Sequence, residues 1–244
     1  MIMTKLYKKS EITFAILWIV AYVVLSSLAD QYSDAIGIHK SLTVVLHIVM
    51  SLILYFWIRK NGLKEKYGLC ASKVPAKKFL YYIPLLIIVC AGLWNGVGLR
   101  YGFPGTLLNF ISMCCVGFLE EVIFRGLLFR AMEKDNLKSA IIVSALTFGI
   151  GHIVNLLNGK DLAGTIVQII FAVLVGLVLV LIFHHGGSLI PCILFHSINN
   201  ALHSFSMEGN LDPKIEMILN VFIIVVVLGG YAVYLLKAFP EKKK

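Results

Sequence analysis

The apolar residues of this chain gather into eight long runs that are separated by short polar segments. A bilayer core about 30 Å thick requires roughly 20 apolar residues from each helix that crosses it, and most of the runs reach this length. The pattern therefore predicts an all-α polytopic membrane protein with about eight transmembrane helices. The runs cover residues 12–29, 41–58, 79–97, 106–131, 137–157, 163–184, 188–203 and 215–236.

Little of the chain lies outside these runs, so residues 1–244 are predicted to form a single membrane domain. The first run is longer than the roughly 7–15 residues of a secretory signal peptide, and we expect it to be retained as a helix. The run over 188–203 is short and contains Pro191. We expect each helix boundary to hold only within a few residues.

The basic residues between the runs alternate between rich and poor segments, although the chain as a whole carries a net charge of +9. Positive residues favour the cytoplasmic side of short loops, so both termini are predicted to face the cytoplasm. The rich segments hold Lys5, Lys8 and Lys9; Arg59 through Lys78; Arg130, Lys134 and Lys138; and Lys237 with Lys242 to Lys244, whereas the poor ones hold Lys40, Arg100, Lys160 and Lys214.

Composition excludes several classes of protein. Hydrophobic residues make up 59% of the chain and charged residues only 14%, against about 25% charged in soluble domains. The five cysteines form no CxxC pair, which argues against a disulfide scaffold or a zinc ribbon. No soluble basic face is evident, so nucleic acid is not an expected partner. The expected partner is the lipid bilayer.

Charged residues enter the fourth run as Glu120, Glu121 and Arg125. An ionised group at the centre of a bilayer costs about 2.5–3.5 kcal/mol on insertion scales, so such positions are candidates for function. Glu121 and Arg125 are four residues apart and can pair on one helix face. Glu120 is rotated by about 100° from that face and is free for another task. Arg125 could instead bind a carboxylate of the substrate.

Two later runs each contribute an imidazole. His152 follows Gly149 and Gly151 in the fifth run, and His196 and Asn200 lie four apart in the seventh. Four-residue spacing places His196 and Asn200 on one helix face, as two groups that bind one substrate oxygen would require. We expect Gly149, Gly151 and Gly126 to permit close helix approach around a shared cavity.

These groups suit hydrolysis by activated water. A carboxylate surrounded by lipid is a stronger base than in water, and nearby imidazole and amide groups can share its proton or stabilise an oxyanion. The chain has no GxSxG elbow and no HExxH zinc signature. Glu120, His152 and His196 could still bind a divalent metal such as zinc, so metal-activated and carboxylate-activated water both stay open, with no cofactor as the preferred reading.

The order of these motifs resembles the CPBP or Abi family of intramembrane proteases, which includes the type II CAAX prenyl endopeptidases. The resemblance covers about residues 60–203, the protease core, and a looser match is Phe171 through Gly176. The motifs that carry it are Glu120-Glu121-x-x-x-Arg125, Phe148-x-x-x-His152 and His196-x-x-x-Asn200.

The resemblance implies transmembrane helices around a catalytic cavity that opens to the cytoplasm, and hydrolysis of a peptide bond in a membrane-associated peptide or protein. It implies that Glu120 is the general base and that His152 shares its proton. His196 and Asn200 would stabilise the oxyanion, with Glu121 and Arg125 in supporting positions.

Small size and short loops are more similar to bacterial members, whose suggested roles are peptide maturation, export and bacteriocin immunity, so the expected location is a bacterial cell membrane. A non-proteolytic scaffold or regulator with the same fold is the alternative. A small transporter would instead show inverted repeats in both halves, whereas the polar groups here cluster in three runs.

Overall fold

The computed structural model describes residues 2–239 apart from residues 158, 160 and 208. Lys160 and Lys242 to Lys244, which entered the charge pattern, lie outside the described residues. Helix accounts for 79% of the structure, and the described residues contain no strand. The only pairing of extended backbone within these residues is an isolated bridge between Val97 and Ser206. The all-α prediction is therefore confirmed.

Six helices are long and apolar enough to cross a membrane within the described residues, which makes this a multi-pass membrane protein. Three of them are single helices: α2 (Glu11–Ile36), α3 (Ser41–Lys60) and α9 (Leu162–Gly186). The other three are each built from consecutive elements. The first joins α5 (Gly105–Glu120), the π-helical η2 (Glu121–Phe129) and α6 (Arg130–Glu133); the second joins α7 (Leu137–Ile150), η3 (Gly151–Ile153) and α8 (Val154–Leu157); the third joins α11 (Pro213–Phe222), η5 (Ile223–Gly229) and α12 (Gly230–Ala238).

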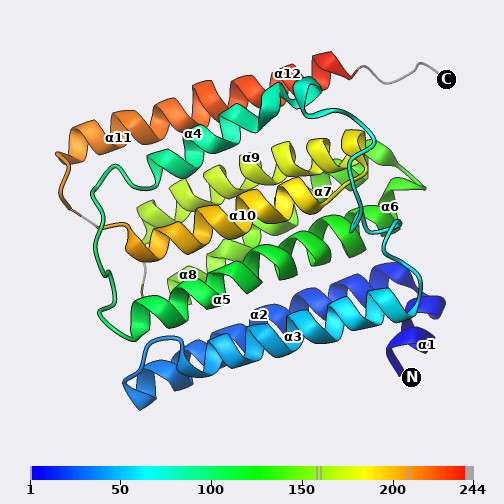
Figure 1. Ribbon diagram of the computed structural model, residues 1–244, viewed down its shortest axis with the longest axis horizontal. Coiled ribbons are helices and arrows are strands. Elements are labelled where there is room, and N and C mark those ends of the chain that lie inside the picture. The colour runs from blue at the N-terminus through cyan, green and yellow to red at the C-terminus, as the bar shows by residue number, and fades with distance from the viewer. Residues whose placement is uncertain (1, 158, 160, 208, 240–244) are drawn as a thin grey trace.

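The two remaining predicted runs contain shorter helices, so the predicted count of eight membrane-spanning helices is not confirmed. Within 79–97, the last residues of η1 (Ala76–Tyr82), Leu80 to Tyr82, have positive φ, which interrupts the helix directly before α4 (Ile83–Ala91). Within 188–203, the 13-residue α10 (Ile190–Leu202) begins with a proline in its first turn. Both α4 and α10 run beside the longer helices (Figure 1).

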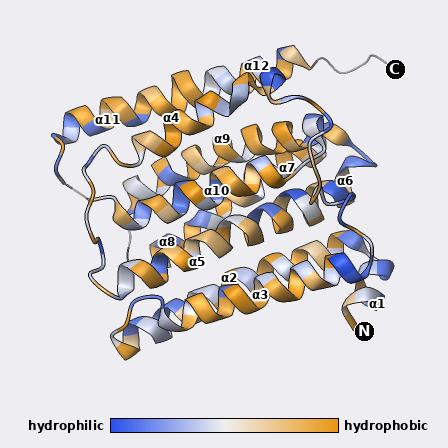
Figure 2. Cartoon of the chain, in the orientation of Figure 1, coloured by the Kyte–Doolittle hydropathy of each residue, from blue (hydrophilic) through white to orange (hydrophobic). Residues whose placement is uncertain are grey.

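The helices are stacked side by side in layers. The α2–α3 pair lies against α5 and η2, and α10 packs on the other side of α5 (Figure 1). Helices α7 and α9 pack together, and α12 with η5 contacts α9. Large apolar side chains such as Ile16, Val20 and Val45 are exposed on the outer faces, as lipid contact requires. Figure 2 shows hydrophilic residues mainly at the helix ends, with further ones inside α5 and α10.

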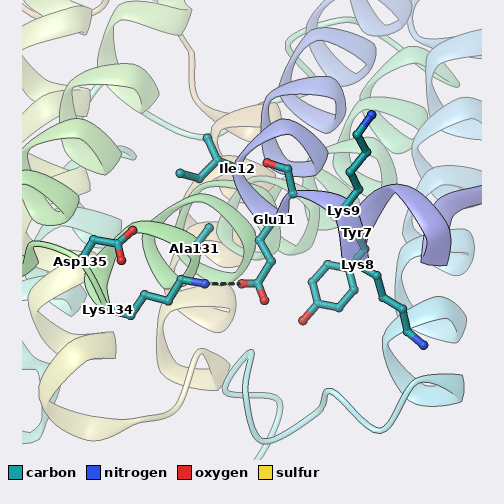
Figure 3. A pocket seen from close by; sticks show the side chains of 9 residues that line it. Tyr7, Lys8, Lys9, Glu11, Ile12, Ala131, Lys134 and Asp135 are labelled. Carbon is teal, nitrogen blue, oxygen red and sulfur yellow. Dashed lines mark ion pairs between the residues drawn. The ribbon is translucent and has the colours of Figure 1, made fainter.

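Both described ends of the chain lie at the same end of the bundle (Figure 1). Here α1 (Ile2–Lys9) and the start of α2 meet α6 around a cavity of about 400 Å³ (Figure 3). The ammonium group of Lys66 donates to Glu11 at 2.7 Å and to the hydroxyl of Tyr7 at 2.8 Å. Burial lowers the pKa of Lys66, but these two hydrogen bonds outweigh it and leave that pKa raised. The cavity belongs to this end of the bundle and is lined by Tyr7 to Ile12, Ala131, Lys134 and Asp135.

Glycines allow some of the helices to approach closely, but only one of the three that the sequence indicated does so. A Cβ atom on Gly149 would lie 2.2 Å from the side chain of Val173, so that expectation is correct. Gly151 has open space around it, and Gly126 makes only ordinary contact at 3.5 Å, so neither permits close approach. The tightest backbone approach involves Gly117, where a Cβ would lie 2.4 Å from the backbone nitrogen of Ser197. Gly117 therefore sets the distance between α5 and α10.

Substitution of Gly117 by alanine is expected to reduce the free energy of unfolding by about 1–3 kcal/mol or more, because the new methyl group would displace the backbone of α10. Thermal unfolding of the purified protein in detergent measures the change. Gly151→Ala is the matched control, since open space surrounds that position. Equal stabilities of the two variants would contradict the close approach.

Candidate active site

Two successive glutamates mark the junction between α5 and η2. Glu120 is the last residue of α5, with its side chain 14% exposed, and Glu121 begins η2 and is fully buried. Short π-helical segments occur frequently at functional sites, where the wider turn redirects side chains. Here the two carboxylates share His196 as a neighbour, and each has one further partner of its own.

Glu121 forms a buried ion pair with Arg125. The distance from Oε1 of Glu121 to Nη1 of Arg125 is 3.1 Å, and both side chains are 0% exposed. The guanidinium of Arg125 also lies over the ring of Phe148, 4.1 Å from its centroid. A Cβ on Gly176 would come within 3.2 Å of Nη2 of Arg125, so a glycine of α9 leaves room for this side chain. The pair fixes η2 against α7 and α9.

His196 connects the two glutamates from α10. Its Nδ1 atom is 2.7 Å from Oε1 of Glu121, and its Nε2 atom is 3.3 Å from Oε2 of Glu120. The bond to Glu121 fixes the ring so that Nε2 faces Glu120. The contact depends on the close approach of α5 and α10 at Gly117, and Ser197 reinforces it by donating from Oγ to the carbonyl of Cys114 at 2.9 Å.

His152 lies in η3 and is oriented by its own helix. Its Nδ1 atom donates to the carbonyl of Phe148 at 3.1 Å, which leaves the lone pair of Nε2 available in the neutral ring. Its ring meets that of Phe148 edge-on at 5.5 Å, and Phe148 meets His196 in the same way at 5.6 Å. Phe148 is thus the common neighbour of both imidazoles. Of the two, the structure brings His196 into polar contact with Glu120.

Asn200 lies one turn after His196 on α10 and is partly buried. Its side-chain oxygen accepts a hydrogen bond from Asn199 at 3.3 Å. The amide NH₂ of Asn200 is therefore the part of this side chain that can donate to another group. The roles of Asn200 and His152 stay predictions.

Tyr22 is a site residue that the sequence analysis did not identify. It is only 8% exposed, and its hydroxyl donates to Oε1 of Glu120 at 2.7 Å. A tyrosine in an apolar run reads as a packing residue, and 98 residues separate it from Glu120. Nothing in the local sequence pattern indicates the contact.

A metal does not fit this arrangement. Across the residues that the structure describes, no group of three or more His, Cys, Asp or Glu side chains is placed to hold a metal ion. The conditional ligand set of Glu120, His152 and His196 does not gather into such a group.

Comparison with protein families identifies part of the chain. Residues 102–202 match the model of the Rce1-like type II CAAX prenyl endopeptidases. No curated protein and no solved structure matched. The matched segment contains Glu120, Glu121, Arg125, His152, His196 and Asn200. The match supports a CAAX protease-type hydrolase. Residues 102–202 thus resemble the Rce1-like type II CAAX prenyl endopeptidases, a similarity that is consistent with the CPBP family.

Proposed function

We propose that the protein is an intramembrane endopeptidase in which Glu120 activates water to hydrolyse a peptide bond. The observation that carries this proposal is the position of Glu120. Its carboxylate is partly buried within a membrane-spanning helix, inside the segment that matches the endopeptidase family, and one of its oxygens faces His196 at 3.3 Å. A buried carboxylate with an adjacent imidazole is the arrangement that water activation requires.

In this proposal, a water molecule transfers a proton to Glu120 as its oxygen attacks the carbonyl carbon of the scissile bond. His152 shares that proton through Nε2. The lone pair of Nε2 is available because Nδ1 donates to the carbonyl of Phe148. The proton then passes to the nitrogen of the leaving amine as the C–N bond breaks. One water molecule is consumed, and a carboxylic acid and an amine are released.

His196 and Asn200 are proposed to stabilise the oxyanion of the tetrahedral intermediate. The imidazole of His196 and the side-chain amide of Asn200, one turn away on α10, are the two groups assigned to the oxyanion. Glu121 orients the imidazole of His196 through its 2.7 Å contact with Nδ1. Losing one oxyanion donor typically costs about 10²–10³ in rate.

We propose a membrane-associated peptide or protein as the substrate, in a bacterial cell membrane with both termini in the cytoplasm. The end of the bundle that holds α1 and α6 carries many of the basic residues, which supports the orientation by the positive-inside rule. Peptide maturation, export or bacteriocin immunity are the biological roles that such cleavage would serve. A scaffold that retains the fold would not require a partly buried carboxylate at Glu120, whose desolvation is costly.

Cleavage by the purified protein in lipid nanodiscs tests this function. Two probes are offered: a farnesylated peptide ending in a CAAX sequence, and the same peptide without the prenyl group. His152→Ala is expected to reduce the cleavage rate by about 10²–10⁴-fold through loss of proton transfer. His39→Ala, in the turn between α2 and α3, is the matched histidine control and should retain the wild-type rate. Unchanged cleavage by His152→Ala would contradict its role.

A further inference from the structure

We infer that Tyr22 is a positioning residue that fixes the carboxylate of Glu120, so that α2, which lies outside the matched segment, forms part of the active site. This inference rests on the proposed role of Glu120 as the general base. It assigns a function to the N-terminal helix pair, which the sequence motifs leave as generic membrane anchors.

The two oxygens of Glu120 have different partners. Oε1 accepts the hydroxyl proton of Tyr22 at 2.7 Å, and Oε2 faces Nε2 of His196 at 3.3 Å. Tyr22 is 8% exposed and the Glu120 side chain 14% exposed, so bulk water does not compete effectively for the bond. A hydrogen bond to a charged group in such surroundings is short and strong. With Oε1 held by Tyr22, Oε2 is the oxygen left to receive a proton from water.

The position of the Tyr22 ring is itself fixed by a polar cluster between three helices. The ring lies against His47 of α3, with centroids 5.8 Å apart. His47 is 2% exposed and contacts the hydroxyl of Ser26 on α2 at 3.0 Å and that of Ser112 on α5 at 2.9 Å. These contacts join α2, α3 and α5 at the level of the site. They explain why polar groups are retained on these faces despite the cost of burial.

Loss of the tyrosine hydroxyl would release Oε1 while leaving the ring in place. The carboxylate of Glu120 could then rotate about its terminal torsion, which has a broad and shallow energy profile. The expected consequence is a kcat that is about 10–100-fold lower at nearly unchanged KM, because substrate binding does not involve this oxygen.

Infrared difference spectroscopy of Tyr22→Phe tests the contact without reference to activity. The carboxylate stretching band of Glu120 is first identified by its loss in Glu120→Gln. In Tyr22→Phe that band is expected to shift, because the carboxylate has lost a strong donor. Tyr32→Phe is the matched control, since Tyr32 lies on the same helix but is 63% exposed, and it should leave the band unchanged. Cleavage of the farnesylated CAAX peptide is measured on the same samples.

The outcomes separate this inference from the proposed function. A shifted band together with a lower kcat supports the inference. An unshifted band overturns it, and so does a wild-type kcat in Tyr22→Phe. If the band shifts but the wild-type protein cleaves neither form of the peptide, the contact stands and the protease proposal loses its support.

Discussion

Glu120→Gln is expected to lower the rate of peptide hydrolysis by about 10²–10⁴-fold, the usual contribution of a positioned general base. Glutamine has nearly the same shape and can still accept the hydroxyl proton of Tyr22, but it cannot remove a proton from water. The fold should therefore persist while catalysis is lost. Initial rates with the farnesylated CAAX peptide, at equal amounts of folded protein in nanodiscs, measure the effect.

Glu133→Gln is the matched control for this substitution. Glu133 ends the same long helix and pairs with Arg130, with its side chain 20% exposed. It lies 13 positions further along this helix, about 20 Å from Glu120 at a rise of about 1.5 Å per residue, so it should not alter catalysis. Comparable rates for wild type and Glu120→Gln would show that this carboxylate is not the base.

Glu121→Gln is expected to reduce the free energy of unfolding by about 3–5 kcal/mol, because it leaves the charge of Arg125 buried without an anion. Both side chains of this pair are 0% exposed, and Nε and Nη2 of Arg125 have no hydrogen-bond partner within the described structure. The variant also removes the charged partner of Nδ1 on His196. Loss of stability and loss of activity should thus accompany one another. Thermal unfolding in detergent measures the first.

Glu133→Gln serves again as the comparison, since it breaks the pair with Arg130 near the end of the helix. The two side chains of that pair are 18% and 20% exposed. Solvent screening reduces the contribution of such partly exposed ion pairs to the free energy of unfolding to about 0–1 kcal/mol. A large difference between the variants is therefore expected. Similar melting temperatures would indicate that the buried pair is not a major source of stability.

Local spacing predicted part of the site. The four-residue interval between Glu121 and Arg125 indicated an ion pair on one helix face, and the structure forms it at 3.1 Å. The rotation of Glu120 away from that face gives it Tyr22 as a partner of its own, although it shares His196 with Glu121. Such relations follow from helix geometry alone, which is why the sequence reveals them.

Contacts between distant helices could not be predicted in the same way. His196 meets Glu121 across 75 residues, and Tyr22 meets Glu120 across 98, so both depend on how the helices pack. The same limit applies to close helix approach. The sequence indicates Gly151, which has open space around it, and not Gly117, because only packing shows which glycine faces a neighbouring backbone. The interruption at Leu80 to Tyr82 is likewise hidden, because an apolar run shows no sign of its backbone conformation.

This membrane protein is proposed to cleave peptides through Glu120. Mass spectrometry of small secreted and membrane peptides, from cells that contain wild type, Glu120→Gln or Glu133→Gln at matched membrane levels, tests it most directly. We predict that a precursor accumulates, or a processed peptide disappears, in Glu120→Gln alone. If all three give the same peptides while deletion of the chain produces a phenotype, the protease account is contradicted and a scaffold function takes its place.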